Sequence, residues 1–215
     1  MSDFDFKNIK TLFPWFLNNK KSIYFDNAAT THKPISVIKK ISDFYSFENT
    51  NVHRGSYDLG LKNTSQFESV RSLVKDFISA HSKESIVFTS GATDAVNLVA
   101  YSYGKKFVSK GDIILVSPIE HHSNLIPWKI LAQENRAQLK EIPLTKEFTV
   151  DMRRLRAMLN NKVKLIAINH VSNVTGGAQN IKGICKEAGC FNIPVFVDGA
   201  QAMPHLNVNV EALGC

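Results

Sequence analysis

Residues 194–202 read PVFVDGAQA. A short apolar run follows a proline and ends on Asp198, and small residues come directly after it. Such a run is typical of a buried parallel strand, and open α/β sheets bind ligands at the carboxyl ends of their strands. We therefore expect Asp198 at the mouth of a site, where a buried carboxylate needs a cation or a protonated ring nitrogen as its partner. The alternative is that Asp198 caps the next helix.

Predicted strands and helices alternate along the sequence before this run. The sequence predicts strands at residues 86–89, 113–116, 139–142, 164–168 and 195–197, and helices at 92–107, 122–134, 151–160 and 180–189. This pattern indicates a mostly parallel sheet with helices on both faces, so the predicted fold class is α/β. Before it, the sequence predicts helices at about 6–18, 34–48 and 62–80, and a short strand or extended arm at 22–26.

Composition narrows the class of protein. The chain has 215 residues, of which 44% are hydrophobic and 21% are charged, as in an ordinary soluble globular protein. Its net charge of +7 motivates a nucleic-acid-binding module as a third hypothesis, but the Lys and Arg residues are scattered, so we expect no nucleic-acid partner. The chain has three cysteines without metal-site spacing, which favours a reducing, cytoplasmic environment. It also has an acidic start and no long apolar stretch, so we expect no contact with membranes.

A possible phosphate site lies at residues 89–93, which read TSGAT, between a predicted strand and a predicted helix. Small residues at a helix start let backbone N–H groups approach an anion, and the helix dipole adds positive potential. The Thr93 hydroxyl is a further donor. The run matches neither of the usual glycine-rich nucleotide loops, and an ordinary capped helix is the alternative.

Polar side chains also follow the other predicted strands. His122 lies in the run EHHSN (120–124), and its imidazole suits ring stacking or proton transfer better than metal binding, because the run lacks metal-ligand spacing. Asn173 lies in a polar, glycine-containing segment (169–177) that a simple turn also explains. Consecutive strand ends therefore present Thr93, His122, Asn173, and Asp198 with Gln201. Pyridoxal 5′-phosphate needs such a set: a phosphate site, a stacking ring, a hydrogen-bonding amide and a carboxylate.

Six segments together resemble the class V aminotransferase family, most closely its group II (Suf-type) cysteine desulfurases. They are DNAATT (26–31), VHRG (52–55), TSGAT (89–93), EHHSN (120–124) with Pro127-Trp128, HVSNV (170–174) and VDGAQA (197–202). The resemblance implies the large domain of fold-type I enzymes, which depend on pyridoxal 5′-phosphate. It divides the chain into an N-terminal helical arm with part of the small domain (1–60) and an incomplete cofactor-binding large domain (61–215).

The resemblance also implies roles for individual residues. Ala92 and Thr93 are expected to hold the phosphate, His122 to stack on the pyridine ring, Asn173 and Gln201 to bond the phenolic oxygen, and Asp198 to pair with the ring nitrogen. Ala28 and Asn173 are expected to seat the amino-acid substrate. His53 and Arg54 resemble a segment near the subunit interface and the substrate entrance, although a structural role for both remains open.

The implied activity is the removal of sulfur from L-cysteine, which gives L-alanine and an enzyme persulfide for iron–sulfur cluster assembly. The implied partners are a second copy in a homodimer and a sulfur-acceptor protein. A selenocysteine lyase or another class V lyase is an alternative, as is a non-catalytic remnant or split subunit. In the family, the Schiff-base lysine and the persulfide cysteine follow the position of Cys215. The 215-residue chain by itself is therefore expected to be inactive and unstable, with residues 86–89 lacking their partner strands.

Overall fold

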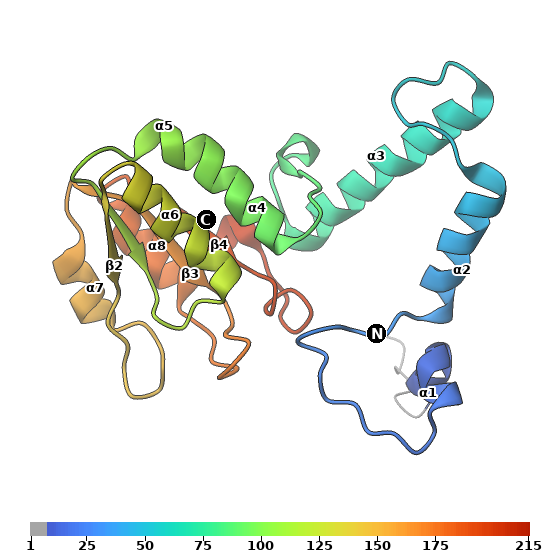
Figure 1. Ribbon diagram of the computed structural model, residues 1–215, viewed down its shortest axis with the longest axis horizontal. Coiled ribbons are helices and arrows are strands. Elements are labelled where there is room, and N and C mark those ends of the chain that lie inside the picture. The colour runs from blue at the N-terminus through green and yellow to red at the C-terminus, as the bar shows by residue number, and fades with distance from the viewer. Residues whose placement is uncertain (1–7) are drawn as a thin grey trace. The chain divides into compact units, whose positions relative to one another are not determined.

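The computed structural model describes residues 8–215, which fall into two units (Figure 1). The first unit ends at Arg71 and the second is Ser72–Cys215, so the division falls within the long helix α3, Asp58–Ile78.

The first unit is helical. It contains the 3-10 turn η1 (Ile9–Leu12), α1 (Pro14–Asn18), α2 (Ile35–Asp43), the π-helical turn η2 (Phe44–Glu48) and the start of α3. The helix predicted at 34–48 is thus α2 continued by η2. The helix predicted at about 6–18 begins within residues 1–7, which lie outside the described residues, and the remainder is split between η1 and α1. Residues 22–26, predicted as a strand or an extended arm, form no strand.

The second unit contains a parallel sheet formed by four of the five predicted strands, and the prediction of a strand at residues 86–89 is wrong because this run forms no strand. The strands are β1 (Ile113–Val116), β2 (Gln138–Glu141), β3 (Val163–Asn169) and β4 (Val195–Asp198), in the spatial order β2-β1-β3-β4. Residues 86–89 follow the short turn η3 (Lys83–Ser85) and lie outside this sheet, in line with the expectation that they lack partner strands.

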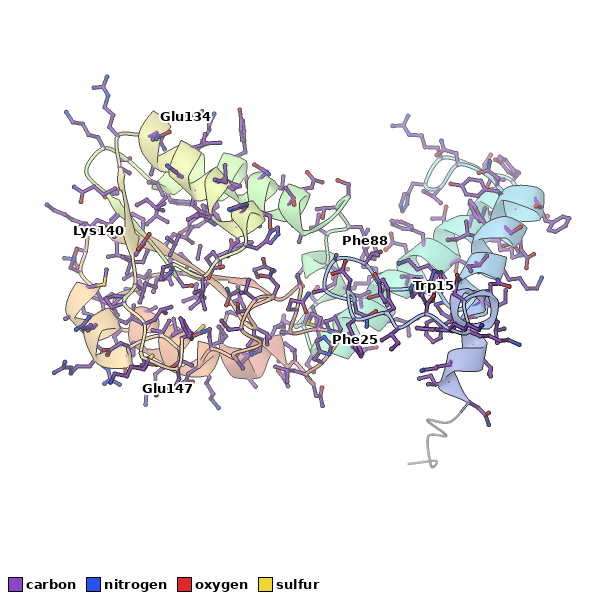
Figure 2. The ribbon with its side chains drawn as sticks, turned by 60° about the horizontal axis from the view of Figure 1, so that its bottom comes forward. Trp15, Phe25, Phe88, Glu134, Lys140 and Glu147 are labelled. Carbon is purple, nitrogen blue, oxygen red and sulfur yellow. The ribbon has the colours of Figure 1, made fainter. Side chains whose placement is uncertain are left out.

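Helices cover both faces of this sheet, and Figure 2 separates the two layers. One layer contains α4 (Ala92–Val99), the π-turn η4 (Ala100–Gly104), α5 (Lys105–Phe107) and α6 (Ile126–Glu134). The other contains α7 (Met152–Met158) and α8 (Ile181–Gly189), and the short α9 (Val210–Leu213) packs against α8. The helices predicted at 92–107, 122–134, 151–160 and 180–189 are therefore present with shifted ends.

The strands are apolar on both faces because each face has its own core. In β1, Ile113 and Leu115 belong to the core under α7 and α8, whereas Ile114 and Val116 belong to the core under α4 and α6. Trp128 of α6 is fully buried in the second of these cores. Because alternate residues of a strand face opposite sides of the sheet, each side packs against its own helix layer. The loops lie at the carboxyl edge of the sheet.

Over residues 8–215, no helix combines the length and the apolar character that crossing a bilayer requires.

Candidate functional site

The carboxyl ends of neighbouring strands meet at one edge of the sheet. β3 ends at Asn169 and β4 ends at Asp198, and the strand register pairs these two residues. Just beyond the strands, the His170 N–H donates to the Asp198 carbonyl oxygen at 2.9 Å. β1 lies on the other side of β3 and ends at Val116. The loops after β1, β3 and β4 are therefore neighbours, at the edge where α/β sheets bind ligands.

The amino end of α4 is open and rich in N–H donors. Gly91 precedes it with a φ of 156°, and a Cβ at this position would meet no atom within 4 Å. The first backbone hydrogen bond of the helix runs from the Ala95 N–H to the Gly91 oxygen at 3.0 Å. The N–H groups before Ala95, including those of the exposed Ala92 and Thr93, have no partner within the helix, and the helix dipole favours an anion there.

Two histidines occupy the turn after β1. This turn, η5 (His122–Asn124), packs against both α4 and β3. The Nδ1 atom of His121 lies 2.7 Å from Ser123 Oγ and accepts the Ser123 N–H at 3.2 Å. His122 is exposed, and its ring centroid lies 6.2 Å from that of His121. The stacking role is predicted for His122, whereas His121 has the contacts that orient a ring. The serine two positions after His121 is the signal for this anchoring.

A buried carboxyl group that the sequence pattern does not predict, that of Glu120, directly precedes this turn. Glu120 is only 8% exposed. Its Oε1 atom accepts the Asn169 N–H at 2.8 Å, and its Oε2 atom accepts the Asn124 amide at 2.6 Å. Asn124 Oδ1 in turn accepts the Trp128 indole N–H at 3.0 Å. Burial raises the pKa of Glu120 to about 7, although these hydrogen bonds lower it, and the charge of Asp198 raises it further.

The loop after β3 is a tight turn built around Ser172, which is buried. Its Oγ atom accepts the N–H groups of Val174 and Thr175 at 3.2 and 3.3 Å, and its own N–H donates to the Gly177 oxygen at 3.1 Å. Asn173 lies within this turn and is exposed. The turn explains the polar and glycine residues of this segment, and the role of the Asn173 carboxamide stays a prediction.

Asp198 and Gln201 lie where β4 turns away from the sheet, and both are half-buried. The Asp198 Oδ1 atom accepts the Ala200 N–H at 2.9 Å, a bond within the turn that orients the carboxylate. Because the charge of Asp198 affects the pKa of Glu120, these two carboxyl groups interact electrostatically.

The second unit thus holds most of the predicted site residues near one edge. His122, Asn173, Asp198 and Gln201 follow strands of the sheet, and Ala92 and Thr93 begin a helix that packs against the His122 turn. Their individual roles remain untested predictions. The other predicted residues, Ala28, His53 and Arg54, belong to the first unit. There the His53 N–H donates to Thr64 Oγ1 at 2.9 Å, and Ala28 and Arg54 are exposed.

The chemistry of these groups fits pyridoxal 5′-phosphate. The open start of α4 offers N–H donors and positive potential for a phosphate, with room above Gly91 because no side chain fills that space. The carboxylate of Asp198 can pair with a protonated pyridine nitrogen, and the adjacent histidines supply flat rings. The donor set therefore fits a phosphorylated aromatic cofactor at this edge.

Comparisons with known proteins identify the family of this chain. Residues 23–215 match the protein family described as Aminotransferase class-V. A protein of Halalkalibacterium halodurans named "Probable cysteine desulfurase" is 43% identical over 210 residues, which cover 96% of this chain and 52% of that protein.

Solved structures with the same fold include the apo structure of a cysteine desulfurase from Thermococcus onnurineus NA1. It has a TM-score of 0.92 and 34% identity, over 100% of this chain and 52% of that chain. The cysteine desulfurase CsdA from Escherichia coli has a TM-score of 0.88 and 32% identity, over 98% of this chain and 52% of that chain. The chain thus spans about half the length of the relatives it matches.

Proposed function

The chain belongs to the aminotransferase class-V family, and on this premise we propose that it supplies the cofactor-holding part of a pyridoxal-phosphate-dependent cysteine desulfurase. The observation that carries the proposal is the arrangement of the carboxyl edge, where Asp198 ends β4 and the turn after β1 packs against α4. The similarity to proteins named cysteine desulfurase supports the choice within the family.

Each polar group at the carboxyl edge of the sheet has one role in the proposed function. The N–H groups at Ala92 and Thr93, with the Thr93 hydroxyl, bind the phosphate. The carboxylate of Asp198 keeps a proton on the ring nitrogen, because an anion next to that nitrogen favours its protonated form. When bound, pyridoxal phosphate supplies an electron sink for the amino acid's α-carbon.

The remaining predicted residues orient the cofactor and the substrate. His122 packs its ring against the pyridine, and Asn173 and Gln201 hydrogen-bond the phenolic oxygen. Ala28, Asn173 and Arg54 contribute to the binding of the amino acid. Orientation of this kind lowers the barrier because the reacting groups are held in position before the reaction.

The overall reaction of the whole protein is the conversion of L-cysteine to L-alanine. A protein thiolate takes the sulfur and becomes a persulfide, which a sulfur-acceptor protein then receives for iron–sulfur cluster assembly. We propose that the whole protein works as a cytoplasmic homodimer.

The test begins with cofactor binding by the whole protein, which is monitored through the quenching of its tryptophan emission. We expect pyridoxal phosphate to bind at least about tenfold more tightly than pyridoxal, which lacks the phosphate, because hydrogen bonds to a charged group are strong. The substitution Thr93→Val should remove most of this difference. Thr11→Val, on the exposed turn η1, is the matched control. Equal affinities for the two compounds would refute the assigned phosphate site.

The second test measures alanine production from L-cysteine by the whole protein. Asp198→Asn is expected to lower the rate at saturating cofactor, because the ring nitrogen loses the anion that keeps it protonated. Unchanged alanine production in this variant would exclude the role given to Asp198.

A further inference from the structure

Glu120 connects two turns that lie far apart in the sequence. The Asn169 N–H at the end of β3 donates to Glu120 across a separation of 49 residues. A second bond reinforces this contact, because the Asn169 side-chain amide donates to the Ile119 oxygen at 2.9 Å. These two hydrogen bonds hold the turn that contains His121 and His122 against the end of β3, which precedes Asn173.

The order of donors and acceptors in this network is fixed from both ends. The backbone N–H of Asn169 and the indole N–H of Trp128 can only donate. Asn124 must therefore present its oxygen to Trp128 and its amide to Glu120, as the distances of 3.0 and 2.6 Å show. Position 120 then needs an acceptor on both sides, which a carboxylate provides and a carboxamide cannot.

We propose that Glu120 is a positioning residue of the cofactor site, whose buried carboxyl group sets the histidine turn relative to the ends of β3 and β4 before the cofactor binds. This inference rests on the proposed function, because it concerns the same site. Glu120 touches the supporting turns and acts through them.

The electrostatics of the site support this role. The pKa of Glu120 is raised to about 7, chiefly by burial, so its charge changes near neutral pH. The groups around it are Ser117 after β1, Asn124 of η5, Asn169 of β3 and the carboxylate of Asp198 on β4. His121 and His122 follow it directly in the chain. Glu120 is linked to Trp128 through Asn124, whose amide donates to Glu120 and whose oxygen accepts the Trp128 indole N–H.

The experiment replaces the acceptor and then restores it. Glu120→Gln keeps the shape of the side chain but turns an amide toward the Asn124 amide, so two donors face each other. The double variant Glu120→Gln with Asn124→Asp reverses the order of the pair and again gives every donor an acceptor, with the same total charge. Glu147→Gln is the matched control, because Glu147 is exposed on the loop between β2 and α7 (Figure 2).

Two readouts are taken on the whole protein, in a background where every tryptophan except Trp128, including Trp15, is replaced by phenylalanine. The first is the affinity for pyridoxal phosphate. We expect Glu120→Gln to lower it by about tenfold, since a buried donor loses its acceptor, and the double variant to recover most of this loss. The second is the Trp128 emission between about pH 5 and about pH 9. We expect a transition near pH 7 that Glu120→Gln abolishes, whereas Glu147→Gln changes neither readout.

The outcomes separate this inference from the proposed function. Failure of the unsubstituted chain to bind pyridoxal phosphate would contradict the proposed function, and the emission readout would then decide the role of Glu120. An unchanged emission profile in Glu120→Gln overturns the inference. So does unchanged cofactor affinity in Glu120→Gln, or a double variant that binds no better than the single one.

Discussion

Asn169 and Asp198 are register partners at the carboxyl ends of β3 and β4, and the His170 N–H closes the pair by donating to the Asp198 carbonyl oxygen at 2.9 Å. The backbone of Asp198 is therefore held by the sheet and does not depend on its side chain. Substitution of this side chain is expected to change the charge at the edge without moving the turn.

Asp198→Asn tests the charge at this edge. The asparagine oxygen can still accept the Ala200 N–H, so the turn is retained. We expect the affinity of the chain for pyridoxal phosphate to fall by about tenfold or more, because a neutral amide binds a protonated ring nitrogen less strongly than a carboxylate does. Asp43→Asn, on the exposed face of α2 where Asp43 pairs with Lys39, is the control in the same fluorescence titration. Equal affinities in the two variants would rule out this role for Asp198.

The two adjacent histidines can be distinguished by parallel substitutions. We expect His122→Ala to weaken the binding of pyridoxal phosphate and His122→Phe to preserve it, because a flat ring is retained. His121→Ala is expected to cost up to about 1 kcal/mol of stability, because the contacts with Ser123 at the start of η5 are lost. Titrations and urea denaturation measure the two effects. A loss of affinity confined to His121→Ala would transfer the stacking role to that residue.

Gly91→Ala tests the backbone before α4. The φ of 156° at Gly91 is one that side chains disfavour, although a Cβ would meet no atom within 4 Å. We expect a loss of about 1–2 kcal/mol in the free energy of unfolding, caused by backbone strain alone. Gly189→Ala at the end of α8 is the control, because its Cβ also meets no atom within 4 Å and its φ is not positive. Equal effects of the two substitutions in urea denaturation would contradict the assignment to strain.

Glu120 also predicts a pH dependence of stability. Its pKa is raised from 4.5 to about 7, so folding disfavours the ionised form. The contribution of the protonated Glu120 carboxyl group to the free energy of unfolding is fully present below about pH 4.5. It is lost as the pH rises to about 7. Relative to Glu120→Gln, the free energy of unfolding of the unsubstituted chain should therefore fall by about 3 kcal/mol across this range.

Urea denaturation at a series of pH values measures this difference. Burial also lowers the pKa of His170, but His170 is common to both proteins and its effect cancels. A difference in stability that stays constant with pH would show that Glu120 does not titrate as described.

Much of the second unit could be predicted from local pattern. The strands containing Ile114, Ile166 and Phe196 are short apolar runs between turn signals, and their burial on both faces follows from helices that precede and follow them. The helix ends were less predictable. The helix predicted at 122–134 begins instead as η5 and continues as α6, because the cap at His121 and Pro127 divide the segment.

The Glu120 network could not be predicted in full. A glutamate beside two histidines and a serine is typical of an exposed turn, and its main partner, Asn169, lies 49 residues further along the chain. Only the hydrogen bond between Asn124 and Trp128 could be predicted from the sequence. The indole N–H of a buried Trp128 needs an acceptor, and Asn124 lies four residues before it. Nor does periodicity show that residues 86–89 stay outside the sheet, because pairing depends on which strands are available as neighbours.

The strand order β2-β1-β3-β4 bears on how the polypeptide can acquire its shape during synthesis. β1 emerges from the ribosome first, β2 pairs with one of its edges, and β3 and then β4 extend the sheet from the other edge. Each new strand thus finds a preformed template, and no earlier pairing has to open. The ligand-facing rim is completed only when translation reaches β4 and Asp198, so nascent chains released before that point would lack it.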